Sequence, residues 1–112
     1  PYPVIWHYLA LARAGNGTAL TELMVDAGKL KQDEWPYPVV DMFLGKRGLD
    51  AMVAAAKSDD QKCEAQYYGG ILNLLQKDNA RATTMLKAAA DSCPGGFIEH
   101  SGASAELKRL GQ

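Results

Sequence analysis

The chain has 112 residues, the size of one compact domain, and its hydrophobic fraction of 47% is enough to build a core. Its 12 Lys and Arg balance 13 Asp and Glu, so it lacks the basic excess typical of nucleic-acid-binding proteins and of segments that bind anionic membranes. No apolar run approaches the roughly 20 residues of a membrane-spanning helix. We therefore expect no nucleic-acid partner and no membrane insertion by this segment. Because the sequence opens without an initiator Met, we expect a piece of a longer protein.

The composition favours helices. Alanine occurs 17 times and leucine 13 times, whereas valine, isoleucine and threonine together occur 12 times. Alanine and leucine are good helix formers, and β-branched residues are the usual material of strands. The predicted fold class is all-α.

Glycines, prolines and capping residues divide the first half into four expected helices. The first spans 4–14, and the second follows Thr18, whose side chain is expected to cap it, and ends near Gly28. Pro36 precedes the third helix, and residues 49–57 form a short fourth one.

The second half has clearer boundaries. Ser58 and Gln61 have the spacing of a capping box at the start of a fifth helix, which runs to about Gln76. Asp78 or Asn79 caps the sixth helix, and a seventh lies within 97–110. The connections are short, so consecutive helices should form antiparallel hairpins. We expect hairpins over about 3–31, 36–57 and 58–93 and a capping helix over about 97–110, all in one domain, 1–112.

A short sequence is repeated. The residues Pro-Tyr-Pro-Val-Ile at 1–5 return as Pro-Tyr-Pro-Val-Val at 36–40, and Tyr8-Leu9-Ala10 then matches Phe43-Leu44-Gly45. A period near 34 residues with two helices per unit is typical of a helical-hairpin solenoid.

The spacing of small and apolar residues resembles the tetratricopeptide repeat. The second helix of that repeat matches Ala82, Leu86, Ala89 and Pro94, and the first helix matches Ala65, Tyr68, Gly69 and Leu72, with one extra residue in the turn at 77–79. Almost the whole chain is similar to the C-terminal module of bacterial tetratricopeptide proteins akin to an envelope lipoprotein scaffold. The segments that carry this likeness are 8–15, 34–36, 43–45, 63–65, 67–69 and 97–110.

The resemblance implies a right-handed α-solenoid whose groove binds a peptide or a partner domain, with more regular repeats upstream. Several members of the family dimerise, so a homodimer is a further expectation. The main functional hypothesis is a non-enzymatic scaffold or adaptor in the bacterial periplasm or cell envelope, with the cytoplasm left open and no cofactor expected. The alternatives are a capping or dimerisation segment of a longer solenoid, and an accessory domain of a larger enzyme.

The two cysteines support two interpretations. Cys63 lies near the start of the fifth helix and Cys93 at the end of the sixth, and an antiparallel hairpin brings these ends together. A disulfide would indicate an oxidising compartment such as the periplasm. The other interpretation is that both are small buried residues that do not react.

The candidate partner-binding residues are polar or small positions of the fifth helix and the turn after it. Opposite Ala65 and Leu72, the repeat register places Gln66, Gly70, Asn73 and Lys77. These residues could line a groove, or they could be ordinary solvated surface.

No catalytic or metal site is expected. His7 and His100 are isolated from other ligands, and the carboxylates form no recognisable acid–base pair. Asn16-Gly17-Thr18 has the pattern of a glycosylation acceptor, but a turn followed by a Thr cap accounts for it.

Overall fold

The structure, a computed structural model, describes residues 2–32 and 34–112, so Pro1 of the repeated sequence lies outside the described residues. The described residues are all-α, as predicted, and no helix among them is long and apolar enough to cross a membrane. Their helices are α1 (Tyr2–Arg13), α2 (Ala19–Ala27), α3 (Tyr37–Phe43), α4 (Leu49–Ala55), α5 (Asp59–Leu75), α6 (Asn79–Ser92) and α7 (Ile98–Arg109).

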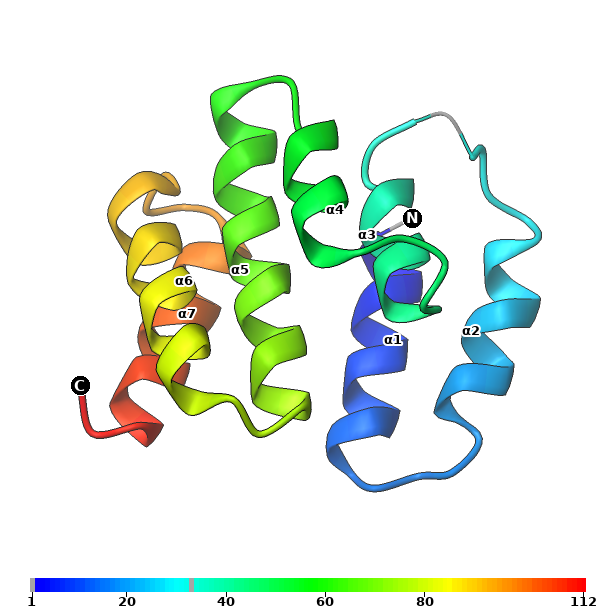
Figure 1. The fold of residues 1–112 in the computed structure, drawn as a ribbon, viewed down its shortest axis with the longest axis horizontal. Helices are drawn as coiled ribbons and strands as arrows, with labels where there is room; N and C mark the ends of the chain where they lie inside the picture. The colour runs from blue at the N-terminus through cyan, green and yellow to red at the C-terminus, as the bar shows by residue number, and fades with distance from the viewer. Residues whose placement is uncertain (1, 33) are drawn as a thin grey trace. The chain divides into compact units, whose positions relative to one another are not determined.

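The helices divide between two compact units, Pro1–Met52 and Val53–Gln112, with the boundary inside α4. In the first unit α1 and α2 pack as an antiparallel pair, and in the second α5 packs on α6 and α6 on α7 (Figure 1). The α1–α2 pair, which begins at Tyr2, and the α5–α6 pair correspond to the expected hairpins 3–31 and 58–93, and α7 packs on α6 beyond the second of these. The α3 and α4 helices are not among the extensively packed pairs, so a hairpin over 36–57 and a solenoid stay predictions.

The helix starts of the second unit follow from local sequence. The Ser58 hydroxyl oxygen accepts a hydrogen bond from the Gln61 backbone N–H at 3.1 Å, which confirms the N-cap of α5. The Gln61 side chain reaches one residue further back than in the usual capping box and accepts from the Lys57 N–H at 2.9 Å. At α6 the capping residue is Asp78, which accepts from the Arg81 N–H.

In the first unit the repeated sequence builds a repeated core. The helices α1 and α3 begin at Tyr2 and Tyr37, the second residue of each copy. At the eighth position, Tyr8 and its counterpart Phe43 are both buried, and their ring centroids lie 5.2 Å apart. Equivalent residues of the two copies therefore pack on one another.

Tyr8 makes the stability of this core sensitive to alkaline pH. Burial raises the pKa of the Tyr8 phenol above its ordinary value of 10.0, so the folded state holds this proton more tightly than the unfolded state does. The associated stability is complete below the unfolded pKa and is lost as pH rises through the folded one. We expect Tyr8→Phe to reduce the loss of unfolding free energy between neutral pH and about pH 11, measured by urea denaturation. Parallel pH profiles for the two proteins would contradict this.

Candidate functional site

The four residues predicted to line a groove do not share one open surface. Gly70 is buried between α5 and α6, where an added Cβ would lie 2.9 Å from the Leu86 side chain. Asn73 is also buried, and its Nδ2 donates a hydrogen bond to the Met85 sulfur at 3.2 Å. Both residues therefore belong to the α5–α6 interface. The side of α5 that was expected to be open is covered by α6.

The other two predicted positions are more accessible. Gln66 is half-buried on α5, and Lys77 is exposed in the turn that follows it. Lys77 has a positive φ of 62°, so the chain turns sharply there before α6 begins. Of the predicted groove set, Gln66 and Lys77 are the two that a partner could reach.

Gly70 allows the close approach of α5 and α6, and this has a measurable consequence. Gly70→Val should lower the free energy of unfolding by about 1–3 kcal/mol, because the branched side chain would displace Leu86. The matched control is Gln66→Val on the same helix, which introduces the same residue at a half-buried position and should cost about 0.5 kcal/mol or less. Equal losses of unfolding free energy in the two variants, measured by urea denaturation, would show that the contact between Gly70 and Leu86 does not limit the size of the side chain at position 70.

The predicted disulfide is confirmed. Cys63 and Cys93 are bonded, with their Cα atoms 5.1 Å apart, and both side chains are buried. The bond joins the first turns of α5 to the residue that ends α6. A disulfide of this kind is consistent with an oxidising compartment.

The second unit buries carboxylates that the sequence pattern did not identify. On α7, Leu107 and Leu110 are half-buried, whereas Glu99 and Glu106 are buried with Ala103. Glu99 is 4% exposed, and it accepts a hydrogen bond of 2.8 Å from the hydroxyl of the fully buried Tyr68. The i, i+4, i+7 spacing of these residues was the available signal, because it places both carboxylates on the face of Ala103.

A close contact also fixes α7. A Cβ added at Gly102 would lie 2.7 Å from the Tyr67 hydroxyl, so this position of α7 leaves room for the tyrosine of α5. The Nδ1 of His100 is buried and has no hydrogen-bond partner among the described residues. Within residues 2–32 and 34–112, no group of three or more His, Cys, Asp or Glu residues is placed to hold a metal ion.

The most distinctive surface lies on α2, in the first unit. One side of this helix is packed and buries Ala19, Leu23 and Ala27. The other side leaves large apolar side chains in water: the exposed fractions are 50% for Leu20, 61% for Met24 and 61% for Val25. We call these three residues the α2 apolar face. Leu20 and Met24 are one helical turn apart, and Val25 lies further round the helix, beyond Thr21 and Gly28.

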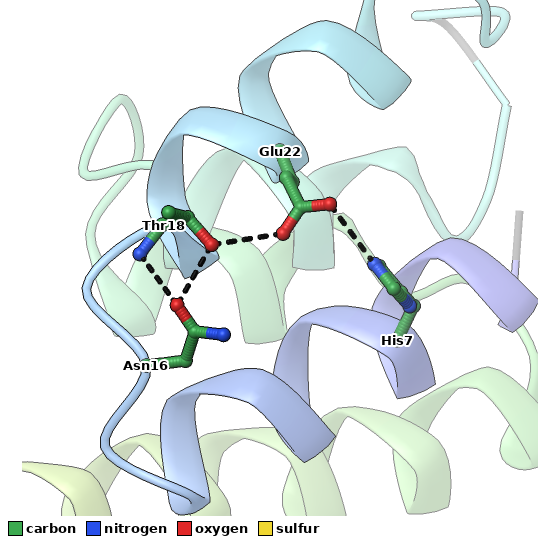
Figure 2. A network of polar contacts seen from close by, with 4 residues as sticks. All are labelled: His7, Asn16, Thr18 and Glu22. Carbon is green, nitrogen blue, oxygen red and sulfur yellow. Dashed lines mark hydrogen bonds and ion pairs between the residues drawn. The ribbon is translucent and has the colours of Figure 1, made fainter.

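Polar contacts link the turn before α2, the first residues of α2 and His7 of α1, as Figure 2 shows. The Thr18 hydroxyl lies 2.8 Å from Asn16 Oδ1 and 3.0 Å from Glu22 Oε2, so its one hydrogen can be donated to either. Glu22 also approaches His7 Nε2 of α1, at 3.6 Å. The expected cap is different in detail: Thr18 makes no side-chain bond to the helix backbone, and its own N–H donates to Asn16 Oδ1.

The fold and these surfaces define an all-α protein built from packed helix pairs, with one disulfide and an exposed apolar helix face. No protein-family profile matches the chain, and no solved structure matches it either.

Proposed function

We propose that this chain is a non-enzymatic helical-hairpin module of the tetratricopeptide type that binds a partner protein. The observation that carries the proposal is the α2 apolar face. The packed side of α2 buries its apolar residues, yet the three large side chains of the α2 apolar face remain exposed to water. Clustered apolar exposure of this kind is characteristic of surfaces that are covered by a partner.

The chemistry of the face selects one kind of occupant. Thr21 and Gly28, which lie between Met24 and Val25 round the helix, are neutral, whereas Glu22 and Lys29 border Val25 on its other side, so the uncharged part of the face is centred on Leu20 and Met24. A ridge with a four-residue period fits the groove between the ridges of another helix. We therefore propose the apolar side of an amphipathic helix, supplied by a different protein, as the occupant.

The size of the face argues against a stable homodimer formed through it alone. Covering three side chains that are half to two-thirds exposed would contribute roughly 3–5 kcal/mol, which is comparable to the lower limit for the entropic cost of association. A stable dimer usually buries about 800 Å² on each side. The partner should therefore make further contacts beyond the α2 apolar face.

The tetratricopeptide assignment is supported by the repeat and by close helix packing. Equivalent residues Tyr8 and Phe43 pack together, and Gly70 lets α5 approach α6. The disulfide favours the periplasm or cell envelope as the compartment.

Site-specific crosslinking tests the binding proposal. A photoreactive amino acid is placed at Met24 in the protein produced by its native host, and a control protein carries it at the exposed Lys87 of α6. We expect an adduct at position 24 that is absent at position 87, that maps by mass spectrometry to an amphipathic helix of one other protein, and that is lost in the Leu20→Asp, Val25→Asp variant.

Two results would overturn the proposal. An adduct between two copies of this chain would replace the hetero-partner with the dimerisation alternative. No adduct at position 24 above the level at position 87 would show that the α2 apolar face is not a binding surface. Circular dichroism of the double Asp variant keeps the test valid by showing that the helices are retained.

A further inference from the structure

The connection between α1 and α2 contains a reactive dipeptide. Asn16 and Gly17 are both exposed, and nothing lies within 4 Å of the position that a Cβ on Gly17 would occupy. In the described part of the chain the Gly17 N–H donates no hydrogen bond to the protein. The backbone nitrogen that follows the Asn16 side chain is therefore accessible and unhindered.

The Asn16 side chain is held with its carbonyl oxygen in use and its amide nitrogen free. The Thr18 N–H donates to Oδ1 at 2.9 Å, and the Thr18 hydroxyl, whose one hydrogen can be donated to Oδ1 or to Glu22, lies 2.8 Å from the same oxygen. Figure 2 shows Nδ2 on the side of the amide away from Thr18. The N–H donor makes Cγ more electrophilic and stabilises negative charge on the oxygen, as a donor in an oxyanion hole does.

We propose that Asn16-Gly17 is a site of spontaneous deamidation in the folded protein. The Gly17 nitrogen forms a bond to Asn16 Cγ and loses its proton to water, the Cγ–Nδ2 bond breaks, and Nδ2 leaves as ammonia. Water then opens the resulting five-membered imide at one of its two carbonyls. The products are aspartate, or isoaspartate in which the main chain runs through Cγ. No oxidant, reductant or enzyme is needed.

The surrounding backbone sets the barrier. The Asn16 N–H donates to the Leu11 carbonyl at 2.9 Å, and the Asn16 carbonyl accepts from the Ala19 N–H at a longer 3.2 Å. Turning the Gly17 nitrogen toward Cγ also turns the Asn16 carbonyl, so the hydrogen bond between that carbonyl and the Ala19 N–H must open. Glycine permits the rotation at little steric cost because it has no side chain.

The chain contains its own controls, because it has two other asparagines. Asn73 is 3% exposed inside α5 and is followed by leucine. Asn79 is exposed but begins α6, and its carbonyl accepts from the Thr83 hydroxyl at 2.8 Å, so its backbone is fixed by the helix. Neither residue combines exposure, a following glycine and a non-helical backbone.

The modification changes the charge at the start of α2. A carboxylate at position 16 would share the Thr18 hydroxyl with Glu22, placing two negative charges around one donor. Aspartate can still accept from the Thr18 N–H, whereas isoaspartate lengthens the main chain within the turn that joins the helices.

Peptide mapping tests the proposal on the purified, oxidised protein. Samples are held at mildly alkaline pH and 37 °C, and loss of each asparagine is followed by mass spectrometry, with isoaspartate detected by enzymatic methylation. We expect loss of Asn16 to be at least about tenfold faster than loss of Asn79, because Asn79 must first break helical hydrogen bonds. Gly17→Ala, at a site with open space and no positive φ, should slow the reaction at Asn16 to a rate near that of Asn79.

Either of two results would overturn the proposal. Equal rates at Asn16 and Asn79 would show that the turn protects the dipeptide. An unchanged rate at Asn16 in Gly17→Ala, with the helical circular dichroism retained, would show that the glycine nitrogen is not the nucleophile. Both results are independent of whether the α2 apolar face binds a partner.

Discussion

Replacing Cys63 and Cys93 together by alanine is expected to lower the free energy of unfolding of the second unit by about 3–4 kcal/mol. The bond closes a loop with a sequence separation of 30 residues, and without it the unfolded chain regains the conformations that the loop excludes. Urea denaturation of the oxidised protein and of the double variant measures the difference.

Reduction provides the matched control for this prediction. A reductant should destabilise the native chain by a similar amount and leave the Cys63→Ala, Cys93→Ala variant unchanged, because that variant has no bond to lose. Since both sulfurs are buried, reduction should require unfolding, and it should therefore be faster in urea. A double variant as stable as the oxidised protein would show that the helix packing alone defines this unit.

Removing the Tyr68 hydroxyl is the second large change that we expect. In Tyr68→Phe the buried Glu99 loses a hydrogen bond that it accepts at 2.8 Å, and water cannot readily replace it at 4% exposure. A hydrogen bond to a charged group contributes about 1.5–3 kcal/mol, and the loss in unfolding free energy should lie in that range.

A double-mutant cycle separates this bond from its surroundings. Glu99→Met replaces the carboxylate with an apolar side chain of similar length, and the double variant Tyr68→Phe, Glu99→Met removes both polar partners at once. The double variant should be less destabilised than the sum of the singles by about 1 kcal/mol or more. Additive losses would mean that the two side chains are not coupled, and that the carboxylate is satisfied by other groups.

Local sequence was sufficient for the fold class and for most helix boundaries. The Ser58–Gln61 spacing predicted the start of α5 because capping bonds join residues only a few positions apart. The repeat at 1–5 and 36–40 predicted equivalent helices, and α1 and α3 do begin at equivalent residues. The pattern also brought Cys63 and Cys93 together, since an antiparallel hairpin leaves those two ends adjacent, but it left open whether they are bonded, as the structure shows them to be.

The assignment of faces needed the tertiary structure. Gly70 and Asn73 were predicted to line an open groove, but periodicity shows only which residues share a side of a helix and not what covers that side. A second helix, α6, lies against them and buries both. The exposed α2 apolar face escaped prediction for the same reason: the repeat of Leu20, Leu23, Met24 and Ala27 indicates an amphipathic helix without saying which of them remain in water.

The sequence by itself therefore determined the all-α class, the helix ends and the proximity of Cys63 and Cys93, because each depends on residues that are close in the chain or on the ends of one hairpin, and the structure showed that the two cysteines are bonded. Only the tertiary structure decided that Glu99 is buried on Tyr68 and that Leu20, Met24 and Val25 are exposed. The physical reason is that burial and hydrogen bonding between distant residues depend on which helix packs on which, and this is not encoded in any single helix.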